Sequence, residues 1–207
     1  MITSVRNLRI VYGIGLAHRN VAVLLTLLMR GALVFAIFSL TVPASRGFAQ
    51  SGSLDQPPTE IVQRYVLLDQ KGARLDAMSF DTLVPYINWK EEPAWGHVVV
   101  ILDAVVPEDY RKWEVVNKLE VVIPVTFRVL GAVYLETAAF VTEEKTEEIR
   151  FRVRAVRGKW RIIDPVIPPH IGLKRMLNFV REAEVHEQDA TKRRALTVLG
   201  ESLRKAK

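Results

Sequence analysis

The chain has 207 residues, no cysteine and a formal net charge of +6, but five of its 29 basic residues and none of its 23 acidic residues precede Gln50. The part from Gln50 onward is therefore nearly neutral, which argues against nucleic acid as a partner because phosphate binding needs a concentrated basic surface. The lack of cysteine excludes a disulfide framework, a thiolate metal site, a cysteine nucleophile and the lipid-modified cysteine of a bacterial lipoprotein.

Residues 1–49 have the pattern of a secretory signal peptide. Arg30 precedes an apolar run, and the small residues Gly47 and Ala49 lie three and one positions before Gln50, as signal peptidase requires. Met29 is an alternative start that shortens the leader to ordinary signal-peptide length. We therefore expect a periplasmic or extracellular protein after cleavage. The alternative is an uncleaved leader that anchors the chain in the inner membrane, because residues 21–28 add a second apolar run.

Residues 50–58 form a polar, proline-containing spacer, and one globular domain is expected over residues 59–180. Thr59 is the predicted N-cap of a helix that ends near Gly72. The apolar positions of this helix recur at helical spacing and are Ile61, Val62, Tyr65, Val66 and Leu68. A second short helical element is predicted at residues 80–87, and a loop follows at residues 88–96.

Three segments have the composition of strands. Residues 97–106 are almost continuously apolar and predict a strand buried on both faces, whereas residues 119–130 and 148–156 alternate between apolar and polar side chains. Pro124 places the second of these strands at a sheet edge or a bulge. Gly158 predicts a tight hairpin into residues 160–164. Helices are expected from Leu173 and from Ala190, the latter within a basic amphipathic tail at residues 181–207.

This order of elements predicts an α+β fold, with N-terminal helices packed on the concave face of a curled, mostly antiparallel sheet and a C-terminal helical extension. The passages DQKGARL (69–75), PYINW (85–89) and GKWRIIDP (158–165) resemble the nuclear transport factor 2-like, or cystatin-like, superfamily. The resemblance implies a cone in which sheet and helices enclose a pocket. That superfamily includes isomerases, dehydratases, hydrolases and pure binding modules, so the resemblance leaves the function open.

An enzyme of this shape would use an acid or base in the pocket. Asp103, inside an apolar strand, is the candidate, with Tyr65 as its partner, because burial would raise the pKa of the carboxyl group. The alternative interpretation is an Asp103 that faces solvent or pairs with an arginine. The sequence contains no catalytic triad, metal-ligand cluster or phosphate-binding loop, so neither a metal nor a cofactor is expected.

Aromatic side chains suggest a ligand pocket, because flat rings suit apolar or sugar-like ligands. The predicted lining residues are Tyr65, Trp89, Trp95, His97 and Trp113. The alternative interpretation is that the tryptophans pack in the core or at its rim.

Basic side chains suggest two further contact surfaces. Arg150, Arg152 and Arg154 form a row on the outer sheet face that suits an anionic partner or a second copy of the domain, unless acidic neighbours neutralise it across the strands. The leucine stripe of the tail suits weak contact with a membrane surface or a partner's groove, unless it packs on its own domain.

These features favour an exported, non-enzymatic binding or interaction domain of the bacterial envelope. Its expected partner is a small apolar or sugar-like ligand or an envelope protein, and the outer sheet face is compatible with a homodimer. The alternative is a small metal-free isomerase, lyase or hydrolase that uses a pocket Asp and Tyr.

Overall fold

The computed structural model describes residues 54–75 and 77–206, with the backbone alone at residues 77 and 78. The predicted signal peptide at residues 1–49 and the start of the predicted spacer lie outside the described residues. Within these ranges, no helix is both long enough and apolar enough to cross a membrane.

The described chain begins with helices, continues with strands and ends with two helices. The elements are α1 (Pro58–Gln70), α2 (Ala77–Phe80), β1 (His97–Val105), the 3-10 helix η1 (Tyr110–Lys112), β2 (Glu114–Asn117), β3 (Glu120–Tyr134), β4 (Ala139–Val156), β5 (Lys159–Asp164), β6 (His170–Gly172), α3 (Leu173–His186) and α4 (Ala190–Lys205).

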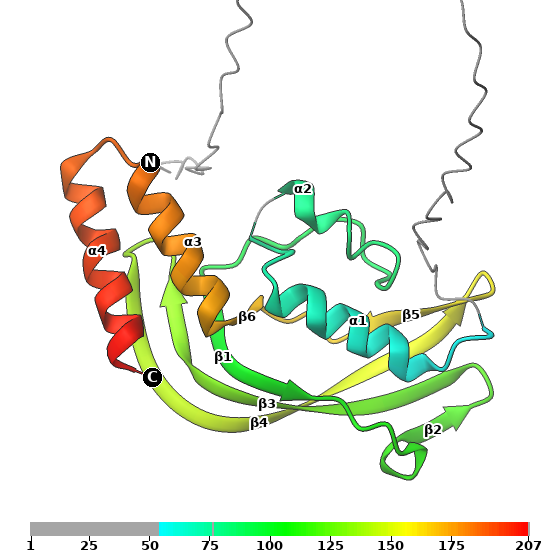
Figure 1. Ribbon diagram of the computed structural model, residues 1–207. Coiled ribbons are helices and arrows are strands. Elements are labelled where there is room, and N and C mark those ends of the chain that lie inside the picture. The colour runs from blue at the N-terminus through cyan, green and yellow to red at the C-terminus, as the bar shows by residue number, and fades with distance from the viewer. Residues whose placement is uncertain (1–53, 76, 207) are drawn as a thin grey trace, which may run out of the picture. The chain divides into compact units, whose positions relative to one another are not determined.

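The strands form a mixed sheet that curls into a half-barrel (Figure 1). Its order is β5-β4-β3-β1-β6, and β2 pairs with β3 beyond the end of β1. β1 and β6 run parallel, whereas β3 is antiparallel to β1 and β4. The predicted α+β fold with a curled sheet is confirmed, and the three-residue strand β6 adds a parallel pair that the sequence pattern does not indicate.

Three neighbouring strands of the sheet change register together. The β1–β3 pairing shifts on both sides of Ile101, and the β3–β4 pairing shifts between Val129 and Gly131. Extra residues in a strand bend it and increase its twist. Gly131 is required at this bend, because a Cβ atom there would lie 2.2 Å from the carbonyl oxygen of Val141.

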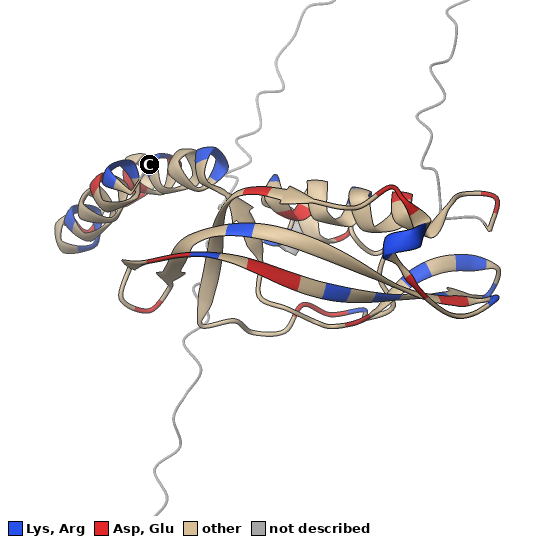
Figure 2. Ribbon diagram, turned by 90° about the horizontal axis from the view of Figure 1, so that it is seen from below, with Lys and Arg blue, Asp and Glu red and all other residues tan. Residues whose placement is uncertain are grey.

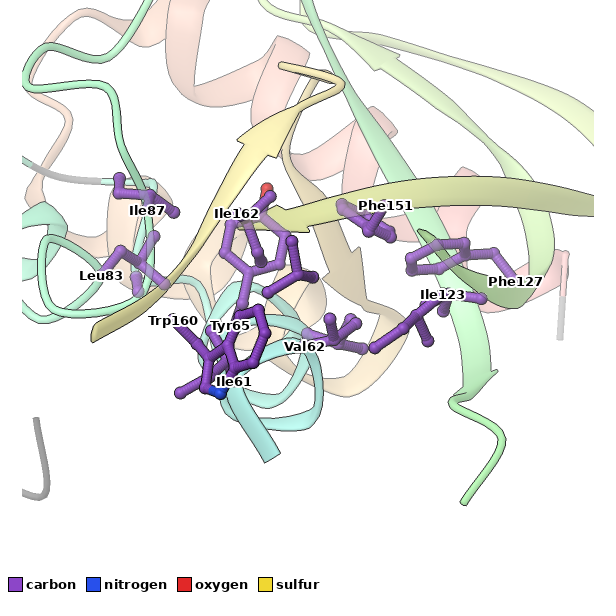
Figure 3. Packing of buried hydrophobic residues seen from close by; sticks show 14 of the residues in the cluster. Ile61, Val62, Tyr65, Leu83, Ile87, Ile123, Phe127, Phe151, Trp160 and Ile162 are labelled. Carbon is purple, nitrogen blue, oxygen red and sulfur yellow. The ribbon is translucent and has the colours of Figure 1, made fainter. Parts of the chain in front are cut away.

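Two buried clusters hold the sheet between helices. The first joins α1 to β3, β4 and β5, and Figure 3 shows Tyr65 among the side chains of this cluster, which also includes Phe127 and Phe151. The second joins α3 and α4 to β1 and β3. Val100 belongs to the second cluster and Ile101 to the first. Because neighbouring residues of a strand point to opposite faces, the two clusters lie on opposite sides of the sheet.

The N-terminal helices differ from the prediction at their ends. α1 begins at Pro58 and its N-cap is Pro57, so Thr59 lies buried in the first turn and does not cap. Proline is favoured at the first helical position because the N–H that it lacks would have no partner in the helix. The second predicted helix is wrong over most of its length: α2 ends at Phe80, and residues 81–86 form turns.

The strands also need corrections. β1 is buried on both faces only up to Ile101. β3 is a central strand, but the described pairings leave residues 123–125 without a neighbour on the side shared by β1 and β2, so Pro124 lies at a local edge. The predicted hairpin is confirmed: Arg157 and Gly158, with φ of 52° and 75°, form the two-residue turn between β4 and β5.

The C-terminal tail packs on the domain. α3 continues past residue 180 to His186, and the Asp189 side chain caps α4 by accepting the N–H groups of Thr191 and Lys192. Leu199 and Leu203 of α4 are buried in the second cluster. The leucine stripe that was expected to suit a membrane surface is therefore occupied by the protein's own core, as the alternative interpretation proposed.

Candidate functional site

A buried group of polar side chains lies at the C-terminal end of α1. Tyr65, Asp69 and Arg74 are all less than a tenth exposed, and Glu92 and Trp95 join them from the loop before β1. We call these five residues the Arg74 cluster. Charged groups are rarely buried unless they are paired, so this cluster is the most unusual chemical feature of the fold.

The helix and the turn after it position the first three residues. Ile61, Tyr65 and Asp69 follow one another at intervals of four, so they share the helix face that packs against the sheet. α1 ends at Gln70, and Gly72 adopts a φ of +84°. This left-handed residue reverses the chain and returns Arg74 to the side of Tyr65 and Asp69.

Hydrogen bonds surround the Arg74 guanidinium. Nη1 donates to the Tyr65 hydroxyl at 3.0 Å and lies 3.6 Å from Asp69 Oδ2. Nε and Nη2 donate to Glu92 Oε1 at 2.9 and 2.6 Å, and Nη2 also donates to the carbonyl oxygen of Ile167. The Trp95 indole donates to the same Glu92 oxygen at 2.6 Å. One arginine thus ties α1 to the loop at residues 88–96 and to the segment before β6.

Asp69 is also held from β6. The backbone N–H of His170 donates to Asp69 Oδ2 at 2.9 Å. The His170 ring packs against Phe127 with centroids 4.6 Å apart, and its Nδ1 lies 2.8 Å from the Pro168 carbonyl oxygen. The cluster therefore includes a fixed contact between the first helix and the last strand.

Burial controls the ionisation of these groups. It raises the pKa of Asp69 to about 7, against the attraction of Arg74, and it lowers the pKa of His170 to about 4. Burial also raises the pKa of Tyr65 far above its usual range, and the Asp69 carboxylate adds to the rise. Tyr65 is therefore a fixed neutral hydroxyl, whereas Asp69 exchanges its proton near neutral pH.

Three buried polar atoms in this region have no hydrogen-bond partner within the described part of the chain: Asp69 Oδ1, Trp89 Nε1 and Glu92 Oε2. Leaving such an atom unpaired costs about 1–3 kcal/mol. A proton, a water molecule or a ligand group that pairs with one of these atoms removes this free-energy cost.

The structure brings together three of the five predicted pocket residues. Trp95 belongs to the Arg74 cluster, and Trp89 meets Tyr65 edge to face at 6.1 Å. His97 instead packs on the Tyr134 ring at 5.8 Å, and Trp113 donates to the Pro107 carbonyl oxygen. Trp89 and Trp113 pack against the first buried cluster, as the alternative interpretation proposed.

Asp103 and Tyr65 are not brought together. The Asp103 side chain is 52% exposed and forms an ion pair of 2.8 Å with Arg128, whereas Tyr65 is 1% exposed. The register shift around Leu102 turns Asp103 to the face opposite Ile101. Asp103 is therefore the paired surface aspartate of the alternative interpretation, and the predicted acid–base pair is absent.

The predicted arginine row is neutralised by neighbouring acids. The ion pairs join Arg150 to Glu114, Arg152 to Glu120 and Asp164, and Arg154 to Glu120. Figure 2 shows acidic and basic positions mixed along the strands seen from below. Exposed pairs of this kind contribute little to stability, but they leave no free block of positive charge for an anionic partner.

Residues 102–119, which we call the edge segment, hold six of the fifteen exposed large hydrophobic side chains of the described residues. Its large hydrophobic side chains with exposed fractions above 40% are Leu102, Val105, Tyr110, Val115, Val116 and Leu119. In the described sheet, β6 pairs with β1 only as far as Ile101, and β2 pairs with β3 alone. Within the described sheet, β1 after Ile101 and β2 therefore each present an unpaired backbone edge, which can accept another strand.

A groove of about 310 Å³ lies beside this edge, between α1 and the end of β1. Val66 and Leu67 contribute from α1, and Ala104 and Val106 contribute from the other side. The groove is shallow and open, so it suits side chains of a larger molecule better than an enclosed small ligand.

The Arg74 cluster was only partly visible in the sequence. Asp69 carries a signal, because it continues the four-residue spacing of Ile61 and Tyr65 onto the buried face. Arg74 and Glu92 lie in segments without periodicity, and His170 is isolated in the sequence because its contact with Asp69 spans 101 residues.

Comparison of the chain with protein-family models, curated proteins and solved structures finds no match. The resemblance to the nuclear transport factor 2-like superfamily therefore stays a prediction.

Proposed function

We propose that the protein is an exported, non-enzymatic interaction domain of the bacterial envelope that binds a protein partner through the edge segment. In this proposal the domain is a cone of the nuclear transport factor 2-like type, with its N-terminal helices on the concave face. Export is supported by the leader pattern at residues 1–49.

The observation that carries the proposal is the run of exposed apolar side chains beside unpaired strand edges. Single exposed apolar residues are ordinary, but several of them in one short segment beside an open strand edge favour a binding surface. A partner strand paired with β1 or β2 gains backbone hydrogen bonds there, and its side chains can enter the groove beside Ala104 and Val106.

A catalytic function has less support. Asp103 is paired at the surface with Arg128, and the buried Tyr65 is bound by Arg74. Asp69 has a pKa near neutrality, but both it and Arg74 are enclosed. An acid or base acts on a substrate only within hydrogen-bond reach, and the partners of the 2% exposed Asp69 are Arg74 and the backbone N–H of His170.

The test is site-specific photo-crosslinking in the native envelope. A photoreactive residue at position 105 or 115 is compared with one at Val185, which is 73% exposed on α3 and lies outside the edge segment. We expect a discrete adduct from positions 105 and 115 but not from position 185, and its mass distinguishes a second copy from another protein. Equal labelling at all three positions, or none at 105 and 115, would refute the partner surface.

Matched substitutions complete the test. Val105→Lys and Val115→Lys are expected to abolish the adduct formed from the other position, whereas Val185→Lys leaves it intact. All three side chains are more than half exposed, so the fold should tolerate each change. Export is checked separately by sequencing the N-terminus of the mature protein, which is expected to begin at Gln50.

A further inference from the structure

We propose that Arg74 and Trp95 form a carboxylate-binding site that Glu92 occupies from within the chain, and that a small aromatic carboxylate displaces Glu92. This inference is independent of the edge segment. It concerns a different part of the molecule and a different class of ligand.

Glu92 lies on the solvent side of the Arg74 cluster. Its side chain is 22% exposed, whereas the side chains of Arg74 and Asp69 are 0% and 2% exposed. Glu92 is therefore the member of the charged group that meets solvent, and its departure would open the guanidinium to the outside. A ligand carboxylate that replaces it keeps the charge of the cluster unchanged.

The loop that carries Glu92 is held mainly by its ends and by side chains. The loop is fixed at its ends, where Asn88 donates to Ile162 and Leu135 donates to Gly96 at 2.9 and 3.1 Å. Between them, the backbone hydrogen bonds described outside helices and strands include none from residues 89–95. Side chains provide the polar ties of this stretch, since Glu92 and Trp95 bind to each other and to Arg74. A segment with so few backbone bonds is held by its side chains, through the packing of Trp89 on the first cluster and the ties of Glu92 and Trp95, so removal of the Glu92 ties loosens it.

The hydrogen bonds to Glu92 use only one of its two carboxylate oxygens. Glu92 Oε1 accepts all three donors, Arg74 Nε, Arg74 Nη2 and Trp95 Nε1, while Oε2 is buried without a partner. A guanidinium binds a carboxylate best when each oxygen accepts one N–H of the fork. Glu92 does not adopt this arrangement in the structure, whereas a free carboxylate can rotate into it.

The surroundings define the ligand class. The Trp95 ring lies 5.7 Å from the guanidinium carbon, and Trp89 and Tyr65 form an aromatic pair beside it. The buried Trp89 Nε1 is a donor without a partner in the described chain. Flat rings around a cation favour an aromatic acid over an aliphatic one.

Glu92 competes with the ligand as a tethered group. A short tether supplies an effective concentration in the millimolar range, so removal of the side chain is expected to lower the apparent Kd of a free carboxylate by about 10-fold or more. The experiment titrates the wild-type protein and the variants Glu92→Ala and Glu92→Gln with benzoate, using tryptophan fluorescence and the melting temperature. Benzamide, which has the same ring without the charge, is the control ligand, and Glu91→Ala, at the exposed neighbouring carboxylate, is the control variant.

The expected result is that benzoate binds both Glu92 variants at lower concentration than it binds the wild type and Glu91→Ala, while benzamide has no effect. If Glu92→Ala does not fold alone, its circular dichroism spectrum should recover in benzoate and not in benzamide. The proposal is overturned if benzoate acts no better on the Glu92 variants than on Glu91→Ala, or if benzamide acts as well as benzoate.

Discussion

Replacement of His170 by glutamine is expected to make the stability of the protein fall as the pH rises from 4 to 7. Burial raises the pKa of Asp69 from 3.8 to about 7, so the folded protein keeps a proton that the unfolded chain releases. The stability from Asp69 is present below pH 4 and lost as the pH rises through 7. Burial lowers the pKa of His170 from 6.5 to about 4, so its contribution is present above pH 6.5 and lost as the pH falls through 4.

The two contributions have similar size and opposite sign. One pH unit corresponds to about 1.36 kcal/mol, which gives about 4 kcal/mol for Asp69 and about 3 kcal/mol for His170. In the wild type they oppose each other between pH 4 and 7. His170→Gln leaves Asp69 uncompensated, so its free energy of unfolding is expected to fall by about 3 kcal/mol relative to the wild type over this range. In Asp69→Asn only the contribution of His170 remains, so the free energy of unfolding is expected to rise by about 4 kcal/mol relative to the wild type over the same range.

The assay is urea denaturation of the three proteins from pH 4 to pH 7.5, with the free energy of unfolding extrapolated to water. The remaining ionisable groups are common to all three proteins, so their contributions cancel in the comparison. Three parallel curves would show that Asp69 and His170 do not change protonation on folding and would refute the reasoning.

Two further substitutions test the fold. Gly131→Ala is expected to lower the free energy of unfolding by about 3 kcal/mol, because the new Cβ would lie 2.2 Å from a backbone oxygen, whereas Gly96→Ala, with no atom within 4 Å of the new carbon, should change it by less than about 0.5 kcal/mol. Leu203→Ala is expected to cost about 2–5 kcal/mol in chemical denaturation, because the side chain is fully buried, and Val198→Ala on the exposed side of the same helix is its control. Equal effects within either pair would contradict the packing described here.

Periodicity predicted the helices and strands that have one buried face. The alternation in residues 148–156 and the turn at Gly158 predicted the second half of β4 and the strand β5, and the leucine stripe from Ala190 predicted the last helix. The pattern weakened where charge is paired within the protein. The first half of β4 is rich in Glu and Lys and reads as a loop, but its backbone pairs with β3 along that length.

Asp103 shows why the candidate site was harder to predict than the fold. Strict alternation from Ile101 places Asp103 on the buried face, as the catalytic interpretation required. A single bulged residue, Leu102, reverses that parity and brings Asp103 to Arg128. One extra residue in a strand moves the next side chain from the core to the surface. Because bulges have no reliable sequence signal, this change of face could not be predicted.

The charges that are buried, Asp69 and Arg74, belong to segments that resemble an ordinary helix end. Besides each other and Tyr65, their partners include Glu92 and His170, which lie 18 and 101 residues away, and local spacing cannot reveal such contacts. The four-residue interval from Tyr65 to Asp69 is the one local pattern that agrees with the buried position of this carboxylate, and it was not used in the prediction.

The contact between Asp69 and His170 also constrains the order in which the domain folds during its synthesis. During synthesis from the N-terminus, α1 emerges 101 residues before the amide that its carboxylate must accept. At 5–20 residues per second this interval is about 5–20 s. Throughout that time Asp69 stays hydrated and the face of α1 has no sheet to cover it completely. The contact between Asp69 and His170 therefore cannot form until β6 has been made.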